Sequence, residues 1–228
     1  MDNQVLDTSF GRSGSALAQN RVLRNTYMLL AATMVPTVLG AMLGVMLKIP
    51  MPGGFMGAIF FMAVAMGFIW AIEKNKNSSL GVGLLMVFTF VMGLFLSRML
   101  GSVLGLKNGG QLIAMAFGGT AAIFAGMSVL GSTIKKDLSS MGKFLFIGAI
   151  MLLVGFLANF YFQSPVLHIA LALVCIGLMS AWLVYDIQRI VRGGETNYVS
   201  ATLSIYLSLF NIFQSLLSLL GIGMGEKD

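Results

Sequence analysis

Seven long runs of apolar residues alternate with short polar stretches along the 228-residue chain. Each run has about 20 residues, the length that an α-helix needs to cross roughly 30 Å of hydrocarbon. The pattern therefore predicts an all-α polytopic membrane protein, a bundle of seven transmembrane helices. The predicted spans are Tyr27–Leu47, Gly54–Ile72, Leu80–Leu100, Leu112–Ile134, Phe144–Phe162, Val166–Tyr185 and Val199–Leu220.

The connections between these runs are short and rich in glycine, proline and asparagine, which are typical of turns. Pro165 opens the sixth run, where a missing N–H costs nothing. The turn between the first two runs is short enough to leave open a single kinked hairpin in place of two spans.

Composition supports a membrane protein, because 57% of the residues are hydrophobic and only 10% are charged. A soluble domain carries about 25% charged residues, so most of this surface is not suited to water. The formal net charge of +6 comes from short basic clusters between apolar runs, a pattern typical of loops beside anionic lipid and not of nucleic-acid binding. Cys175 is the single cysteine, which excludes an internal disulfide.

The distribution of Lys and Arg predicts the orientation of the chain. Ten basic residues fall on the side that carries the N-terminus, and four fall on the other side. We therefore expect a cytoplasmic N-terminus and, with seven spans, a C-terminus outside, in the periplasm. The ten are Arg12, Arg21, Arg24, Lys74, Lys76, Lys135, Lys136, Lys143, Arg189 and Arg192.

The chain divides into a polar segment, a membrane domain and a short end. Residues 1–20 are polar and without helical periodicity, which predicts a disordered cytoplasmic tail. Residues 21–222 form the seven-helix domain, and residues 223–228 form a short polar C-terminal tail. The short loops leave no room for a soluble catalytic domain, so we expect a protein that is not an enzyme.

The last span carries a polar stripe at intervals of four and three residues. This spacing places the stripe on one helix face of roughly 80°. One interpretation is helix–helix contact through small hydroxyl side chains, and the other is a water-lined path through the bundle. Either interpretation places this helix at the centre of the bundle. The stripe consists of Ser204, Ser208, Asn211, Ser215 and Ser218.

Asp186 is the only carboxylate embedded in an apolar run, near the inner end of the sixth span. An acid inside a membrane is a candidate functional residue. Arg189 follows three residues later and is equally able to pair with it at the interface. We expect the charged side chains of Arg189 and Glu195 to lie at the inner surface of the membrane, where Glu195 is solvated.

Three active sites are excluded by the residues present. Retinal proteins need a lysine in the last helix, and Val199–Leu220 has none. A helical metalloprotease needs two histidines, and His168 is the only one. Ser128 lies about 24 Å down the fourth span from the outer face, whereas His168 lies near that face, so the two cannot share a proton.

Six stretches along the chain together resemble the Bax inhibitor-1 family, in its bacterial YccA-like branch. They are residues 21–27 (RVLRNTY), 88–93 (FTFVMG), 116–121 (AFGGTA), 185–188 (YDIQ), 193–198 (GGETNY) and 205–213 (IYLSLFNIF). The likeness runs from Arg21 to Leu220. It implies a seven-helix bundle with the last helix central, and a location in the bacterial inner (plasma) membrane.

The resemblance implies two functions. The YccA-like branch is similar to proteins that bind and restrain the membrane-anchored FtsH protease and are themselves poor substrates for it. For that role, residues Asp2 to Asn20 are a candidate segment for the protease to engage. The expected partners are the lipid bilayer, FtsH and the membrane-associated regulators of FtsH. Other family members are pH-sensitive calcium leaks gated by an aspartate pair. That activity implies no bound cofactor beyond a transient Ca²⁺ ion, and no permanent metal site.

Carried over position by position, the aspartate pair is incomplete in this chain. The first acid is Asp186. The position of the second acid is occupied by Ser208, which belongs to the polar stripe together with Asn211. The family's usual Leu-Tyr-Leu-Asp-x-x-Asn reads Ile-Tyr-Leu-Ser-Leu-Phe-Asn here. Two close carboxylates share a proton and titrate in coupled steps, whereas one carboxylate beside a serine does not. The basic residue expected in the second span is also absent, since Gly54–Ile72 contains no Arg or Lys.

Overall fold

The computed structural model describes residues 2–49 and 53–225, with side chains from Ala18 onward. Within these residues every regular element is an α-helix, as the hydrophobic pattern predicts. The helices are α1 (Asp2–Met46), α2 (Gly54–Asn75), α3 (Ser79–Leu104), α4 (Gly109–Thr133), α5 (Met141–Phe162), α6 (Pro165–Val191) and α7 (Tyr198–Met224). Because α1 ends at Met46 and α2 begins at Gly54, the first two spans are separate helices and not one kinked hairpin.

All seven helices are long and apolar enough to cross a membrane, so the protein is a multi-pass membrane protein with the lipid bilayer as its solvent. Much of the apolar surface faces outward, because lipid replaces water there. In the most apolar stretch of α2 and of α5, only 11% of the residues are buried inside the protein. In the corresponding stretch of α7 the share is 44%.

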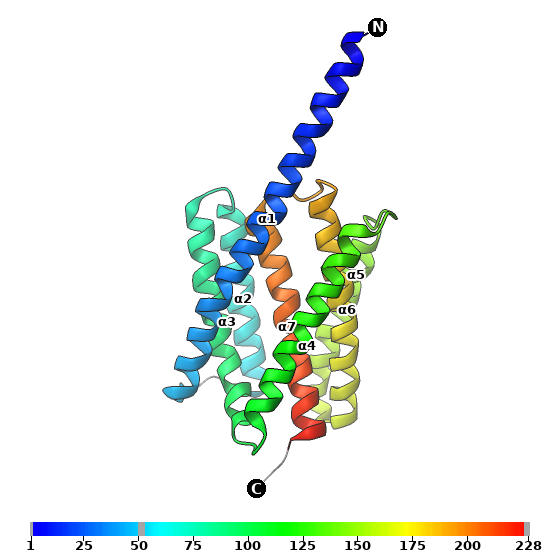
Figure 1. Cartoon of the computed structure of the whole chain (residues 1–228). Coiled ribbons are helices and arrows are strands. Elements are labelled where there is room, and N and C mark those ends of the chain that lie inside the picture. Colours follow the sequence, from blue (N-terminus) through cyan, green and yellow to red (C-terminus); the bar gives the residue numbers. More distant parts are fainter. Residues whose placement is uncertain (1, 50–52, 226–228) are drawn as a thin grey trace.

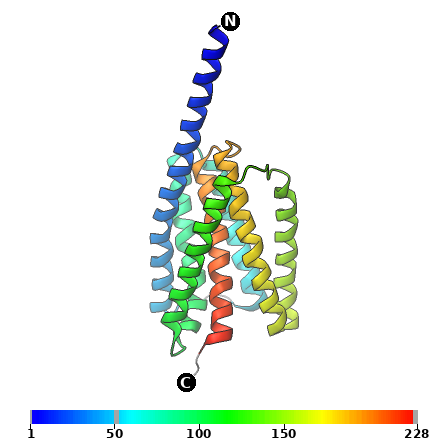
Figure 2. The same ribbon diagram turned by 45° about the vertical axis from the view of Figure 1, so that its right-hand side comes forward.

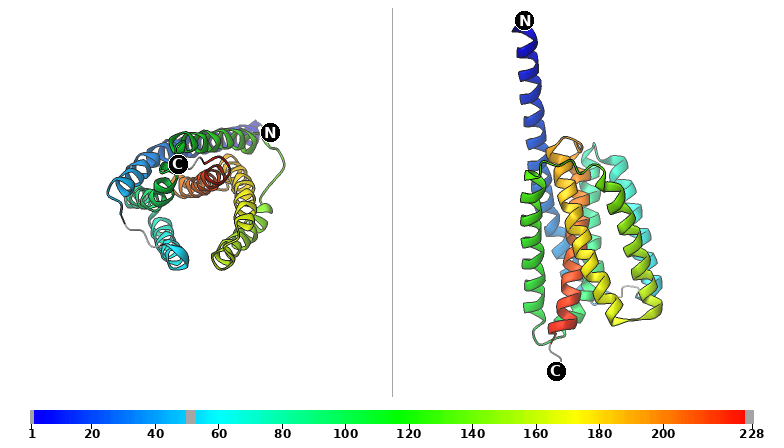
Figure 3. Two further views of the ribbon diagram at one scale, coloured as in Figure 1. Left: turned by 90° about the horizontal axis from the view of Figure 1, so that it is seen from below. Right: turned by 90° about the vertical axis from the view of Figure 1, so that its right-hand side faces the viewer.

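The helices form an arc around α7, which packs against α1, α2, α3, α4 and α6 (Figure 3, left). The main hydrophobic core lies where α7 meets α3 and α6, and it includes Phe88, Leu183 and Ile205. α5 packs mainly on α6 and lies at the edge of the arc. The residues of α7 therefore touch most of the bundle.

The two ends of the bundle differ in charge. The connections α2–α3, α4–α5 and α6–α7 lie at one end, beside the part of α1 that holds Arg21 and Arg24 (Figure 1). We call this end the basic end. The connections α1–α2, α3–α4 and α5–α6 lie at the other, which we call the opposite end, together with the end of α7 (Figure 1).

Close packing of α1 on α3 depends on glycine. A Cβ atom at Gly40 would collide with the backbone carbonyl of Phe90, and one at Gly93 would collide with that of Thr37. The two backbones approach each other so closely because neither glycine has a side chain, which is how small residues join membrane helices. Gly44, one turn after Gly40, lies against the side chain of Ser97.

α1 continues beyond the membrane domain. Its apolar span begins at Ala18, yet the helix starts at Asp2 and projects past the basic end of the bundle (Figures 1 and 2). The sequence predicts a disordered tail over residues 1–20, and the structure instead continues the helix through residues 2–20. A span already in place supplies the nucleus, so each further turn only has to extend an existing helix.

The starts of α6 and α7 are fixed by side-chain caps. The hydroxyl of Ser164 accepts a hydrogen bond from the N–H of Leu167 and precedes Pro165, the first residue of α6. The side chain of Asn197 accepts hydrogen bonds from the N–H groups of Val199 and Ser200 at the start of α7. These caps satisfy N–H groups that a helix leaves unpaired at its N-terminus.

Candidate functional site

The polar stripe of α7 meets α6 at three depths in the bundle. Near the basic end, the hydroxyl of Ser204 donates a hydrogen bond to the carboxylate of Asp186. Ser215 lies beside the thiol of Cys175. Near the opposite end, the hydroxyl of Ser218 lies 2.6 Å from Nε2 of His168. These contacts support the interpretation that the stripe joins two helices, and a water-lined path stays a prediction.

The other two members of the stripe behave differently. Nδ2 of Asn211 donates to the carbonyl of Leu207 in its own helix, at 2.8 Å. Ser208 is buried, with 3% of its surface exposed. Asp186, Ser208 and Asn211 are the three residues expected at the ion pathway. In the structure, Asp186 accepts its hydrogen bond from Ser204, which is not one of the three.

Asp186 is a buried acid, with 5% of its surface exposed. The sequence left open a pair between Asp186 and Arg189. In the structure the guanidinium of Arg189 pairs with Glu195, with 3.4 Å between its nitrogen and the carboxylate oxygen, and stacks over the ring of Tyr185. Glu195, which we expected to be solvated, is thus engaged in an ion pair and has a side chain 19% exposed.

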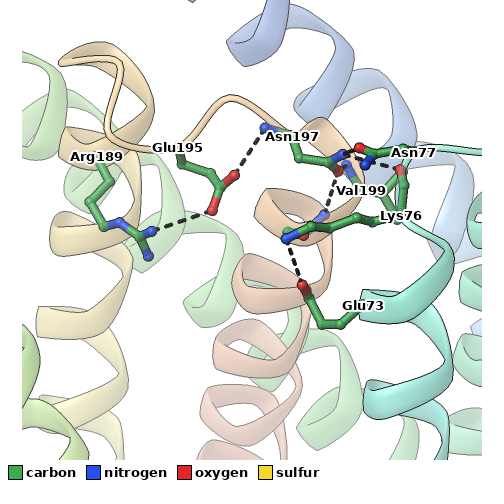
Figure 4. Close-up of polar contacts among 8 residues, drawn as sticks. Glu73, Lys76, Asn77, Arg189, Glu195, Asn197 and Val199 are labelled. Carbon is green, nitrogen blue, oxygen red and sulfur yellow. Dashed lines mark hydrogen bonds and ion pairs between the residues drawn. The ribbon is translucent and has the colours of Figure 1, made fainter.

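A polar network joins the α6–α7 connection to the α2–α3 connection at the basic end (Figure 4). Its centre is Asn197, whose N–H donates to Glu195 at 2.9 Å. Nδ2 of Asn197 also donates to the carbonyl of Lys76 at 3.1 Å and to Oδ1 of Asn77 at 2.8 Å. Lys76 pairs in turn with Glu73 at 3.0 Å. The network fixes both connections over the end of α6 that holds Asp186.

Gln188 holds the α4–α5 connection in the same region. Its Oε1 accepts the N–H of Leu138 at 2.9 Å, and its Nε2 donates to the carbonyl of Lys136 at 2.7 Å. A polar pocket of about 260 Å³ lies beside it, lined in part by Asp137 and Arg192. Sequence reasoning did not single out Gln188, although a polar residue two positions after a membrane acid was a usable signal.

The α4–α5 connection is also stabilised by its own charges. The side-chain and backbone groups of Ser139 donate to Asp137 and lower the pKa of that carboxyl below its usual value. The guanidinium of Arg192 lies 3.9 Å from the same carboxylate and donates to the carbonyl of Lys135.

The described residues contain no group of three or more His, Cys, Asp and Glu side chains that could hold a metal ion. A transient Ca²⁺ ion at Asp186 therefore stays a prediction. His168 lies in the first turn of α6 at the opposite end. α4 begins at that end with Gly109, which puts Ser128 about 28 Å along its helix. His168 bonds Ser218 instead, and its ring packs against Phe156.

Comparison with known proteins decides the family. Residues 19–225 match the family model described as inhibitor of apoptosis-promoting Bax1, which covers every span. The chain belongs to the Bax inhibitor-1 family. The match begins one residue after the start of the first apolar span at Ala18 and includes Asp186, Ser204 and Asn197.

Relatives within the Bax inhibitor-1 family cover nearly the whole chain. The modulator of FtsH protease YccA of Escherichia coli K12 is 37% identical over 219 residues, which is 96% of this chain and 97% of the relative. An uncharacterized membrane protein of Vibrio cholerae is 41% identical over 213 residues, which is 93% of each chain. An inner membrane protein YccA of another Escherichia coli strain is also 37% identical over 219 residues, again 96% of this chain and 97% of the relative.

The basic residue that the Bax inhibitor-1 resemblance implies for the second span has a partial counterpart here. α2 extends to Asn75 and so includes Lys74 in its last turn, beyond the span of Gly54–Ile72 read from the sequence. The amino group of Lys74 lies 5.0 Å from the centre of the Trp70 ring. This cation therefore has an aromatic partner on its own helix.

Proposed function

We propose that this protein is an inhibitor and poor substrate of the membrane-bound FtsH protease, acting in membrane protein quality control at the bacterial inner membrane. The observation that carries the proposal is the 37% identity to the FtsH modulator YccA across 96% of the chain, without a gap large enough to omit a helix. The orientation that goes with it has the N-terminus in the cytoplasm and the C-terminus in the periplasm.

Two features of the fold suit this role. α1 projects past the basic end of the bundle, so Asp2 to Asn20 offer a segment that a protease, or a membrane-associated regulator bound to it, can reach (Figure 2). The rest of the chain consists of seven membrane helices joined by short connections. A protease that pulls on the projecting segment has to extract helices whose backbone hydrogen bonds cannot be replaced in lipid, which favours binding over degradation.

Deleting residues 2–20 tests the proposal. FtsH, a membrane substrate of FtsH and this protein are reconstituted together, and degradation of the substrate is followed with time. We expect the full chain to slow degradation and the deletion variant to lose that effect. A variant in which residues 2–20 are replaced by an unrelated helical sequence of equal length is the control for loss of bulk alone.

The FtsH proposal fails if the deletion changes neither the inhibition nor the slow degradation of the protein itself. A reporter fused to the C-terminus tests the orientation separately. A reporter on the cytoplasmic side would contradict the proposed orientation of all seven spans.

A second candidate function is a pH-sensitive calcium leak, and the buried Asp186 carboxylate between α6 and α7 favours it. Purified protein in liposomes, followed from acid to mildly alkaline pH, tests this activity without any partner protein. We expect calcium flux above that of empty liposomes and a changed pH dependence in Asp186→Asn. Flat traces for the unchanged chain at every pH would remove the leak and leave the protease role alone.

A further inference from the structure

An apolar groove of about 840 Å³ runs along α7 between α1 and α4. α1 lines it from Tyr27 to Met46, and α4 lines it from Gly110 to Phe124. The α1 wall is about 28 Å long at 1.5 Å per residue, close to the roughly 30 Å of a bilayer core. In Figure 1, α7 lies between α1 and α4, so the two walls stand on either side of it.

The lining of the groove is almost entirely apolar, and the hydroxyls of Thr37, Thr120 and Tyr206 already have partners. The hydroxyl of Thr37 donates to the carbonyl of Thr33 at 2.8 Å and lies 3.0 Å from that of Tyr206. The hydroxyl of Thr120 donates to the carbonyl of Ala116 at 2.7 Å. A ligand of this groove is therefore held by van der Waals packing and not by hydrogen bonding.

The groove is closed at the basic end and leads toward the opposite end. Tyr27 and Phe124 pack edge to face there, with 5.8 Å between their ring centres. At the opposite end, the α1 wall ends two residues before Lys48, and the α4 wall begins three residues after Lys107. Lys48 is exposed, so a positive charge lies beside the mouth of the groove.

The volume of the groove suits a lipid chain better than a whole partner helix. A membrane-crossing helix of about 11 Å diameter and 30 Å length fills roughly 3,000 Å³. The groove, at about 840 Å³, is far too small for such a helix but lies within the range of pockets that hold a single small molecule. A hydrocarbon chain is thin enough to lie in the groove along α7.

We propose that this groove is a phospholipid site. An acyl chain lies along α7 between α1 and α4, and the phosphate of the same lipid lies at the opposite end beside Lys48. The site is independent of the protease role and of Asp186, which lies at the α6–α7 interface and does not line the groove.

Native mass spectrometry of the delipidated protein, titrated with phosphatidylglycerol, tests the proposal. We expect one lipid per chain that survives detergent washing. In the double variant Ala114→Phe and Ala121→Phe, the new rings fill the groove from its α4 wall. Retention should fall by about tenfold, because losing roughly ten close carbon–carbon contacts costs that much affinity. Lys48→Gln should weaken retention about fivefold by removing one charge beside the phosphate.

The matched control is the double variant Ala122→Phe and Ala125→Phe. These alanines are also exposed on α4 but do not line the groove, so lipid retention should stay unchanged. Equal retention in the groove variant and the control variant would overturn the proposal.

Photo-cross-linking of the unchanged chain keeps the test independent of how the variants fold. A phosphatidylglycerol with a diazirine at the end of one chain is incorporated into liposomes with the protein, and adducts are mapped by peptide. We expect them to concentrate on the residues that line the groove, above the level on the outward face of α5, for instance at Phe146 and Met151. Adducts spread evenly over both regions, or cross-links between two protein copies at the groove, would overturn the site.

Discussion

Ser204 on α7 donates a hydrogen bond to the Asp186 carboxylate on α6, so the two helices are joined through the one carboxylate set within a membrane helix core. The bond lies just below the α6–α7 connection, where Arg189, Glu195 and Asn197 form their network. Any change of charge at Asp186 therefore acts directly on the contact between α6 and the helix that touches most of the bundle.

A second acid introduced at Ser204 should couple to Asp186, whereas one introduced at Ser208 should not couple as strongly. Ser204 is the hydrogen-bond partner of Asp186, and Ser208 lies one turn further along α7. In Ser204→Asp the two carboxylates share a proton and titrate in two separated steps. Infrared difference spectra of the protonated carboxyl band in purified protein measure this. Two separated steps in Ser208→Asp alone would show that the family position, and not the observed contact, sets the pairing.

Gln188 should be needed to hold the α4–α5 connection. Gln188→Ala leaves the N–H of Leu138 and the carbonyl of Lys136 without their partner, which costs about 1–3 kcal/mol. Gln188→Glu should cost more, because a carboxylate oxygen then faces the Lys136 carbonyl. The free energy of unfolding by SDS in mixed micelles measures both. Gln111→Ala, at an exposed position of α4, is the control and should leave that free energy unchanged.

Removing the hydroxyl of Tyr206 should destabilise the protein modestly. The ring is fully buried against Phe88 and Phe210, and its hydroxyl lies 3.0 Å from that of Thr37. Tyr206→Phe keeps the ring and loses one hydrogen bond, so we expect about 0.5–1.5 kcal/mol in the same unfolding measurement. Tyr161→Phe, at a side chain that is 86% exposed, should have no effect. An equal loss in both variants would mean that the Thr37 contact contributes nothing.

Gly93→Ala should separate α1 from α3. The added methyl group would meet the backbone carbonyl of Thr37, which cannot rotate away as a flexible side chain can. Overpacking of this kind costs about 1–3 kcal/mol in the free energy of unfolding. Gly83→Ala lies on the same helix with open space around its Cβ position, so it should cause no loss. A neutral Gly93→Ala would show that the two helices can shift apart without cost.

The number and position of the helices could be predicted from the sequence, because a helix that crosses a bilayer needs about 20 consecutive apolar residues. Each apolar run predicted as a span lies inside one observed helix, apart from its end residues at Leu47 and Ile134. The extension of α1 to Asp2 was not predictable, since residues 1–20 lack an apolar period and the helix there continues from a span already formed.

The residues of the candidate site were proposed from the sequence, and their pairing could not be. The stripe on α7 was evident from its spacing, and Asp186 was evident from its apolar surroundings. Which stripe residue meets Asp186 depends on the rotation and axial position of α7 against α6, and packing of the whole bundle sets both. The sequence therefore could not choose Ser204 over Ser208, nor show that Arg189 pairs with Glu195.

The position of Asp186 along α6 has a consequence for any ion movement near it. Only five residues separate it from Val191 at the end of the helix, or about 7.5 Å at 1.5 Å per residue. A charge there crosses about a quarter of a 30 Å hydrocarbon layer, and a full crossing is worth about 2.3 kcal/mol per 100 mV. A gate built on this carboxylate would thus be reached by protons from the near side and would respond only weakly to membrane voltage, by about 0.6 kcal/mol per 100 mV.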